Sequence, residues 1–308
     1  MQNSKTTRSV ILLFVAALIW GFSFVVQSEG GIALGAFSFN GARLLLTALV
    51  LRIVITITDK LGVSHRPITP TDKKRQFLAG IICGIFLFLA TNLQQVGLNL
   101  GSGTGKAGFI TSLYILMVPL IGLFFRQKVS WNTWLAVAIA LIGLYFLCVN
   151  GKLEFSLPDI CLILGALGFA GQILTIDRHG NHVDSLRLSG MQFLAAGFLT
   201  AVIAVIFEII PFQGGFIAWI KPLTQWKMWI ELLYMGIMSG GVAYTLQVFC
   251  QKNLNPTVAS LIMSFEAVFS AISGWLVLHQ KLSTREIIGC IIMFAAVIIA
   301  QIRFKKRA

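Results

Sequence analysis

The sequence predicts an all-α membrane protein of ten transmembrane helices, arranged as two inverted five-helix repeats. Three observations lead to this fold class. The composition is 57% hydrophobic and only 11% charged, apolar runs of membrane-spanning length recur along the chain, and the two halves share short motifs in the same order. A soluble domain usually carries about 25% charged residues. This chain has too little polar surface for water and is matched to lipid instead.

The apolar runs define the expected membrane spans. A helix needs about 20 apolar residues to cross the hydrocarbon core of a bilayer. Runs of this kind predict helices at residues 9–28, 34–57, 76–97, 105–125, 131–149, 157–177, 187–209, 229–250, 257–278 and 284–303. No connection between them is long enough for a soluble domain, so any binding must take place between the helices.

The connections also predict how the chain sits in the membrane. With the N-terminus inside, the inner loops carry 16 of the Lys and Arg residues and the outer loops carry 6. Because cytoplasmic loops are enriched in these residues, both termini are expected on the cytoplasmic side of the cell inner (plasma) membrane. The longest outer connection, 210–228, contains Trp219 and Trp226 and is expected to lie among the lipid headgroups, which indole rings favour.

Weak internal repeats support the division into two halves. The stretch that opens with Thr91–Gln94 and closes with Gln127–Ser130 has a counterpart of equal length. That counterpart opens with Tyr244–Gln247 and closes with Gln280–Ser283. Earlier in each half, Phe39-Asn40-Gly41-Ala42-Arg43 aligns with Leu188-Ser189-Gly190-Met191-Gln192. The order and spacing of these matches predict duplicated units.

The boundaries of these units follow from the repeats, with residues 1–150 as the first and 151–308 as the second. Each unit contains five of the expected spans. Five is odd, so the second unit enters the membrane from the opposite side. Inverted repeats of this kind provide a physical route to alternating access around a shared central site.

Glu266 is the foremost candidate for a functional side chain. It lies near the middle of the ninth apolar run, and Ser270 follows one turn later on the same face. Polar groups within the membrane usually face a cavity or a partner helix. Because burial disfavours the charged form of a carboxylate, Glu266 is a candidate proton carrier or ligand for a substrate amine. The alternative is a structural carboxylate paired with Arg43 or with a helix end.

Other polar and aromatic side chains within the spans are candidates for binding a solute: Trp20, Gln94, Gln95, Thr111, Tyr114, Gln172, Tyr244 and Gln247. Gln94 and Gln247 occupy equivalent positions of the two repeats and are placed to bracket one ligand. The alternative for both amides is hydrogen bonding between helices, worth about 0.6 kcal/mol per contact in lipid. Ordinary packing is the alternative for Trp20, and close approach of helices at neighbouring glycines is the alternative for Gln172.

Two basic residues and one proline also carry alternatives. Arg43 either holds a substrate carboxylate or locks its helix to a neighbour, since a guanidinium within the membrane needs a partner or water; the family resemblance given below implies the second role. Lys106 either attracts anionic solutes or extends to the headgroups. Pro119 leaves a backbone carbonyl one turn earlier without its usual partner, which predicts a kink.

The sequence predicts no cofactor, metal site, disulfide or nucleic-acid partner. The five cysteines fall within apolar runs without a CxxC pair, and the histidines lie in or beside loops. The net charge of +13 is spread over short loops and forms no basic patch with interleaved aromatic residues. Gly101–Lys106 is similar to a phosphate-binding loop but lacks the Gly and the Ser or Thr required at positions 100 and 107. ATP-driven transport is therefore not expected.

Over residues 10–303 the sequence resembles the EamA type of the drug/metabolite transporter superfamily. The resemblance is carried by Trp20-Gly21, Arg43, Ala107–Thr111 leading to Pro119, and Ser264–Phe269 before Gln280–Ser283. In two respects the chain departs from the family pattern. Ala267 stands where many members have Pro, while Arg126-Gln127 and His279-Gln280 stand where many have Gly-Glu. The resemblance implies an export or exchange carrier for amino acids, related metabolites or drugs, with a cavity between the halves.

We therefore expect a secondary transporter of small organic metabolites such as amino acids, working by alternating access as a monomer or homodimer. Proton coupling through Glu266 is part of this hypothesis. A membrane enzyme acting on lipid is the alternative, but such enzymes usually need an embedded histidine, a paired acidic motif or a metal cluster. A receptor or scaffold is a further alternative, for which the short loops offer little surface. An enzymatic activity is not expected.

Overall fold

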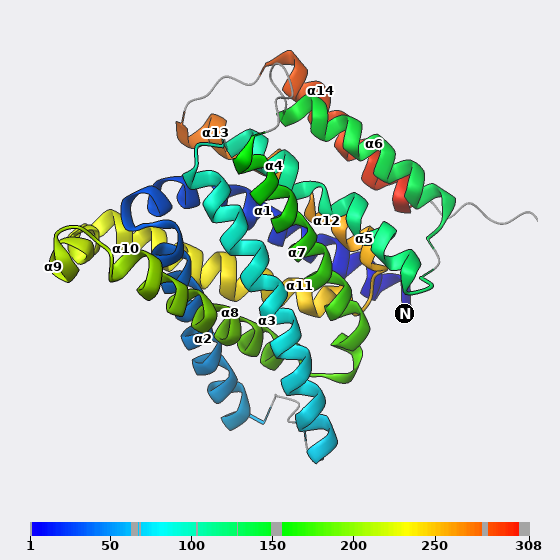
Figure 1. Ribbon diagram of the computed structural model, residues 1–308. Coiled ribbons are helices and arrows are strands. Elements are labelled where there is room, and N and C mark those ends of the chain that lie inside the picture. Colours follow the sequence, from blue (N-terminus) through cyan, green and yellow to red (C-terminus); the bar gives the residue numbers. More distant parts are fainter. Residues whose placement is uncertain are drawn as a thin grey trace, which may run out of the picture.

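The structure is a computed structural model that describes residues 2–62, 67, 69–102, 104–127, 129–148, 156–278 and 283–301. Within these ranges all regular secondary structure is helical (Figure 1). Eight described helical rods are long and apolar enough to cross a membrane: Lys5–Leu34, Ala36–Lys60, Pro70–Asn99, Lys106–Phe124, Leu157–His182, Ser185–Ile209, Trp226–Gln251 and Pro256–Ser273. The chain is a multi-pass membrane protein.

The first half of the chain forms six helices: α1 (Gln2–Leu34), α2 (Ala36–Lys60), α3 (Pro70–Asn99), α4 (Thr104–Ser112), α5 (Tyr114–Phe124) and α6 (Trp131–Cys148). The helices α4 and α5 together make one rod, interrupted at Leu113. Pro119 lies inside α5, more than one turn beyond this interruption. The backbone carbonyl of Leu113 accepts hydrogen bonds from the amides of both Leu116 and Met117. The chain therefore turns at Leu113, and the proline is accommodated within the following helix.

The second half begins with α7 (Leu157–His179), a 3₁₀ turn η1 (Gly180–His182), α8 (Ser185–Ala204) and a π-helical extension η2 (Val205–Ile209). A short α9 (Gly215–Ile220) and a 3₁₀ turn η3 (Lys221–Thr224) follow. The next rod consists of α10 (Trp226–Leu233), the π-helix η4 (Tyr234–Ala243) and α11 (Tyr244–Gln251). The last helices are α12 (Pro256–Met263), α13 (Glu266–Leu278) and α14 (Thr284–Gln301).

Within the described residues each expected span coincides with helix over most of its length, and capping residues explain several of the helix starts. Thr69 accepts a hydrogen bond from the amide of Asp72 before α3, and Asn255 caps α12 through the amide of Thr257. Proline follows both caps at a position where its missing amide hydrogen costs nothing. The repeat-closing residues Lys128 and Gln280–Leu282 lie outside the described residues.

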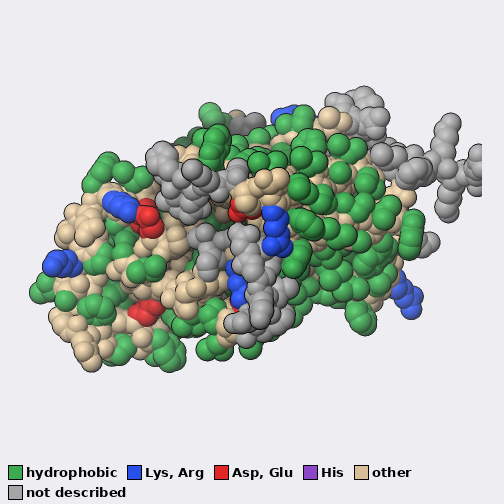
Figure 2. Space-filling model, turned by 90° about the horizontal axis from the view of Figure 1, so that it is seen from above, with side chains coloured by type: hydrophobic (Ala, Val, Ile, Leu, Met, Phe, Trp, Pro, Cys, Tyr) green, Lys and Arg blue, Asp and Glu red, His purple; other side chains and the backbone are tan. Residues whose placement is uncertain are grey.

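The outer surface of the bundle is apolar, as contact with lipid requires. Large hydrophobic side chains such as Phe124, Ile217 and Ile32 are 89%, 82% and 73% exposed. Figure 2 shows hydrophobic side chains spread over most of one face, with few charges among them. A water-exposed protein does not present so large a contiguous apolar area. The interior, in contrast, contains many buried Gln, Asn, Ser and Thr side chains.

The helices α6 and α14 pack side by side at one edge of the bundle (Figure 1). Their contact depends on Gly143 and Gly289. A Cβ atom at position 289 would lie 2.6 Å from the backbone nitrogen of Leu147 and 2.7 Å from the carbonyl oxygen of Gly143. Small residues at such crossings allow helix backbones to approach closely within lipid. The α6 segment Trp131–Leu147 is apolar but shorter than the eight long rods.

The connection between α8 and α10 contains the short helix α9. Phe216 and Ile217 are exposed on it, and the indole of Trp219 stacks on the ring of Phe216 at 5.6 Å. The indole N–H of Trp219 also donates a hydrogen bond to the hydroxyl of Ser38. This segment is therefore apolar and exposed, and it is joined to the start of α2.

Candidate functional site

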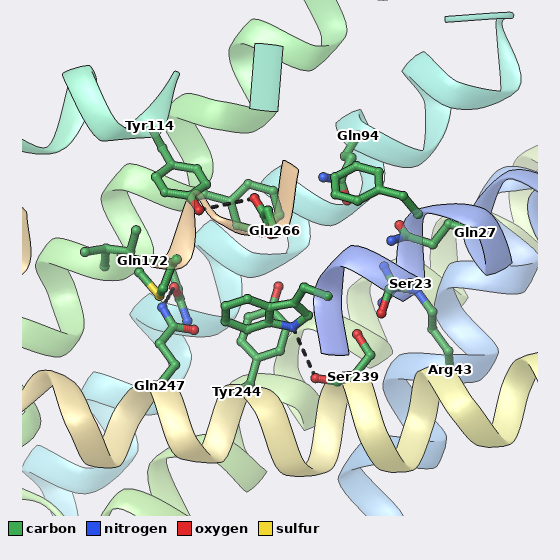
Figure 3. A pocket seen from close by; sticks show the side chains of 15 residues that line it. Ser23, Gln27, Arg43, Gln94, Tyr114, Gln172, Ser239, Tyr244, Gln247 and Glu266 are labelled. Atoms are coloured by element: carbon green, nitrogen blue, oxygen red, sulfur yellow. Dashed lines mark hydrogen bonds between the residues drawn. The ribbon is translucent and has the colours of Figure 1, made fainter. Parts of the chain in front are cut away.

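A small cavity lies among helices from both halves of the chain (Figure 3). It is lined by Trp20, Ser23, Phe24, Gln27, Arg43, Gln94, Tyr114, Phe169, Gln172, Ile173, Ser239, Tyr244, Gln247, Met263 and Glu266. The space open to water-sized molecules is about 40 Å³. That volume holds only a few water molecules. A solute the size of an amino acid would require the surrounding helices to separate.

Two broken helices meet at this cavity. Tyr114 is the first residue of α5, directly after the break at Leu113, and Glu266 is the first residue of α13, directly after the turn at Ser264 and Phe265. The hydroxyl of Tyr114 donates a hydrogen bond to a carboxylate oxygen of Glu266 at 3.2 Å (Figure 3). The helix N-terminus at Glu266 favours negative charge through its free amide groups. Broken helices of this kind form the solute and ion sites of several transporter folds.

Three amide side chains form a buried chain beside the cavity. Gln247 on α11 donates to the carbonyl oxygen of Gln172 on α7 at 3.0 Å, and Gln172 donates to that of Gln192 on α8 at 3.1 Å. All three side chains are at most 2% exposed. These hydrogen bonds between amide side chains hold α7, α8 and α11 in register. It also fixes the direction in which the cavity-lining amide of Gln247 points.

The π-helix η4 shapes another wall of the cavity. The carbonyl oxygen of Ser239 accepts a hydrogen bond from the indole N–H of Trp20 at 3.3 Å. The Trp20 ring contacts the Tyr244 ring edge-on at 4.9 Å, and Phe193 contacts Tyr244 from another side. π-helical turns are rare within α-helices and are frequent at functional sites. Here a backbone carbonyl of η4 is the hydrogen-bond acceptor for the indole of Trp20.

Several cavity-lining polar atoms have no hydrogen-bond partner within the described chain. They are the Nε of Arg43, the Oε1 of Gln27 and the Oε1 of Gln247. Arg43 is only 3% exposed and forms no ion pair among the described residues. Because an unsatisfied buried polar group costs about 1–3 kcal/mol, hydrogen bonds from water or from a solute in the cavity would stabilise these atoms.

The structure brings seven of the ten sequence-predicted site residues to one cavity: Trp20, Gln94, Tyr114, Gln172, Tyr244, Gln247 and Glu266. Three others lie outside its lining. Gln95 donates to the carbonyl oxygen of Gln27 and to Asn99, Thr111 accepts a hydrogen bond from Gln94, and Ser270 lies where α13 crosses Gly21 of α1. They connect helices behind the cavity wall.

The sequence interpretation missed part of the lining. Ser23, Phe24, Gln27, Phe169, Ile173, Ser239 and Met263 were not among the predicted site residues. Trp20, Ser23 and Gln27 share one face of α1, so helical spacing from Trp20 was the available signal. Arg43, for which a structural role is the favoured expectation, lines the cavity where α2 packs against η4.

Lys106 forms an ion pair that the sequence did not indicate. Its ammonium group lies 2.7 Å from the carboxylate of Asp159, which is only 1% exposed. Asp159 also accepts hydrogen bonds from the amide and hydroxyl of Ser156 at the start of α7. Lys106 therefore joins α4 to the start of α7.

These features define a class of protein: a multi-pass membrane protein whose two halves enclose a small polar cavity between broken helices. Comparison with known proteins gives the family. The chain belongs to the EamA-like transporter family, whose sequence model matches residues 7–149 and 156–301. The drug/metabolite transporter resemblance is thereby confirmed.

Individual relatives are similar over nearly the full length of the chain. An uncharacterized transporter of Archaeoglobus fulgidus is 28% identical over 98% of this chain and 88% of its own. The uncharacterized transporter YoaV of Bacillus subtilis is 21% identical, with 94% and 95% covered. An S-adenosylmethionine/S-adenosylhomocysteine transporter of Chlamydia muridarum is 22% identical, with 89% and 85% covered. One solved crystal structure shares the fold, with a TM-score of 0.74 over 96% of both chains at 17% identity.

Proposed function

We propose that this membrane transporter is a secondary carrier, exporting or exchanging small organic metabolites such as amino acids or related compounds by alternating access. The observation that carries the proposal is the cavity itself. It contains a carboxylate at Glu266 and a guanidinium at Arg43, which form no ion pair with each other. In Figure 3, Arg43 and Tyr114, the hydrogen-bond partner of Glu266, lie at opposite sides of the cavity. Separated opposite charges suit a zwitterionic solute.

The proposed architecture has ten spans in two inverted repeats, residues 1–150 and 151–308. The apolar helices α6 and α14 would complete the ten, since they pack along each other at the bundle edge. The family model matches two successive segments. The fourth helix of the first half breaks at Leu113, and that of the second half breaks at Phe265. The number of residues between these two breaks differs by one from the number between Thr91 and Tyr244. A shared break position supports descent from one duplicated unit.

Carboxylate contacts at the two ends of the α2–α8 pair supply further support. The number of residues that separates Phe39 from Leu188 also separates Ser38 from Arg187, and Asp59 from Glu208. At one end, Glu208 accepts hydrogen bonds from the amide and hydroxyl of Ser38. At the other end, Asp59 accepts one from the guanidinium of Arg187. The two contacts involve equivalent positions with the roles of the halves exchanged, as an in-plane pseudo-twofold axis requires.

A shared site that opens to each side in turn needs a closed intermediate. The cavity volume of about 40 Å³ is too small for an amino acid, as expected of a closed intermediate. Glu266 is proposed as the proton-coupling group, because it is a carboxylate that lines the cavity and can bind and release a proton. The Chlamydia relatives named for S-adenosylmethionine act on an amino-acid derivative, in keeping with the proposed solute class.

Counterflow in proteoliposomes tests the proposal. Vesicles containing the purified chain are loaded with a mixture of unlabelled amino acids and diluted into single labelled ones. Accumulation of label above that in protein-free vesicles is expected for at least one amino acid. The corresponding decarboxylated amine should compete poorly, because it lacks the group that Arg43 would bind. If amines and amino acids compete equally, the zwitterion hypothesis is wrong.

The first prediction concerns Glu266→Gln. This variant keeps the side-chain volume but cannot release or take up a proton, so we expect the pH dependence of net transport to flatten while exchange of labelled solute continues. Glu29→Gln is the matched control, since Glu29 pairs with Lys227 away from the cavity. A pH profile that is the same in Glu266→Gln and the wild type would remove the proton role.

The proposed orientation places both termini in the cytoplasm of the cell membrane. A short tag at either end should resist protease in intact cells and become accessible after the membrane is opened. Cleavage of one tag only in intact cells would contradict the even number of spans.

A further inference from the structure

A second groove, separate from the central cavity, lies on the lipid-facing side of the bundle between α2, α3 and α8. It has a volume of about 670 Å³. Its long walls are apolar and exposed, including Leu45, Leu49, Phe77 and Leu194 at 38%, 58%, 53% and 52% exposure. Figure 1 shows α2 and α3 extending to the foot of the bundle, and α8 packs against both of them. The volume is within the range of about 300–1,000 Å³ typical of small-molecule sites.

Three cationic side chains, each from a different helix, line the same groove: Arg52 of α2, Lys73 of α3 and Arg187 of α8. Arg52 and Lys73 are exposed. No acidic residue lines the groove within the described chain. The groove therefore has both an apolar trough and a concentration of positive charge.

Arg187 supplies an independent indication of a ligand. One of its terminal nitrogens contacts the Asp59 carboxylate, but its Nε is buried and has no hydrogen-bond partner within the described residues. A guanidinium presents several donors in one plane and can bind a carboxylate and a phosphate together. Part of the hydrogen-bonding capacity of this groove-lining guanidinium is thus unused.

We propose that this groove binds one anionic phospholipid, with its phosphate among Arg52, Lys73 and Arg187 and an acyl chain along Leu49, Phe77 and Leu194. Charge complementarity selects an anionic headgroup, and the exposed apolar walls select a lipid over a free phosphate ion. Lys73 and Arg187 lie in the first turns of α3 and α8, and Arg52 lies two turns before the end of α2, within reach of the same membrane surface. Basic pockets between helices on the cytoplasmic side are suited to such headgroups. In the proposed orientation the lipid belongs to the cytoplasmic leaflet.

The proposal is tested by native mass spectrometry on the delipidated full chain, with phosphatidylglycerol and phosphatidylcholine of identical acyl chains as probes. Phosphatidylglycerol should be retained preferentially. In Arg52→Gln/Lys73→Gln its affinity should fall by about tenfold or more, because each basic group near the headgroup adds to the attraction. Arg187 is left unchanged because it also holds Asp59.

The matched control is Lys60→Gln/Lys74→Gln, which removes the same charge from exposed positions on the same two helices without touching the groove. It should retain phosphatidylglycerol as the wild type does. Equal loss in both double variants, or equal binding of both lipids by the wild type, would overturn the proposal. Displacement of the lipid by millimolar inorganic phosphate would also overturn it, since the site would then recognise a headgroup alone. The measurement does not depend on transport, so its failure leaves the proposed function untouched.

Discussion

At the scale of single residues, the contact between Tyr114 and Glu266 is the most informative. It joins the two halves at the centre of the bundle through one hydrogen bond of 3.2 Å. Each partner lies directly after a break in its helix. The hydroxyl of Tyr114 is the side-chain partner of the carboxylate within the described residues. Removing the Tyr114 hydroxyl would leave the Glu266 carboxylate without this hydrogen bond.

We therefore predict that Tyr114→Phe lowers the free energy of unfolding by about 1–3 kcal/mol, the usual effect of removing a hydrogen bond to a charged or buried group. It should also slow amino-acid counterflow. Reversible unfolding in mixed detergent micelles and counterflow in vesicles measure the two effects. Tyr145→Phe is the control, because Tyr145 is 38% exposed on α6. Equal stability losses in the two variants would argue against a special role for the Tyr114 hydroxyl.

Residue types alone predicted much of the site but not its outline. Glu266, Gln94 and Gln247 attract attention as polar groups in apolar runs, and all three line the cavity. Arg43 was harder to place, because hydropathy does not specify toward which neighbour a helix turns its polar face. Ser239 was not predictable, because its backbone carbonyl contributes and the π-helix that carries it has no simple sequence signal.

At the scale of helices, the lengths of the apolar runs predicted where the helices lie. A helix end can be recognised in the sequence because hydropathy falls there and a capping residue follows or precedes it. The interruptions at Leu113 and Phe265 were not predicted. Proline at 119 suggested a kink, yet the break lies more than a turn earlier. Tertiary packing determines such positions, because residues after the breaks contact each other across the two halves.

The crossing of α6 and α14 gives a prediction at this scale. In Gly289→Ala the added methyl group would meet backbone atoms of Leu147 and Gly143 at 2.6 and 2.7 Å. Backbone cannot rotate away as a side chain can, so the helices must separate. We expect a loss of about 1–3 kcal/mol of stability, measured as a lower midpoint of thermal unfolding in detergent.

The control for this crossing is Gly108→Ala on α4, where nothing lies within 4 Å of the new methyl group. There the better helix propensity of alanine should leave stability unchanged or raise it by up to about 1 kcal/mol. If Gly289→Ala is as stable as Gly108→Ala, then α6 and α14 do not pack as closely as described.

At the scale of the whole molecule, the α2–α8 pair is held at both ends by carboxylates from opposite halves. Glu208 reaches the start of α2, where the amides of Phe37 and Ser38 donate to it at 2.9 and 2.7 Å. Gly35 precedes them with φ of 102°, and a Cβ atom there would lie 2.7 Å from the carboxylate. Glycine is required at this turn both for its backbone conformation and for this approach.

The paired contacts lead to a final prediction about access to the cavity. Glu208→Ala removes the contact at the end of the bundle nearest α9, and Asp59→Ala removes the one at the opposite end. If each contact holds its own side closed, the two variants should favour opposite conformations. A cysteine at position 23, which lines the cavity, in a background without the five native cysteines, reports which side is open. An impermeant thiol reagent should label it faster from outside in Glu208→Ala and faster from the cytoplasm in Asp59→Ala. Faster labelling from the same side in both variants would show that these contacts stabilise the helices without controlling access, and the carrier would then need gates elsewhere.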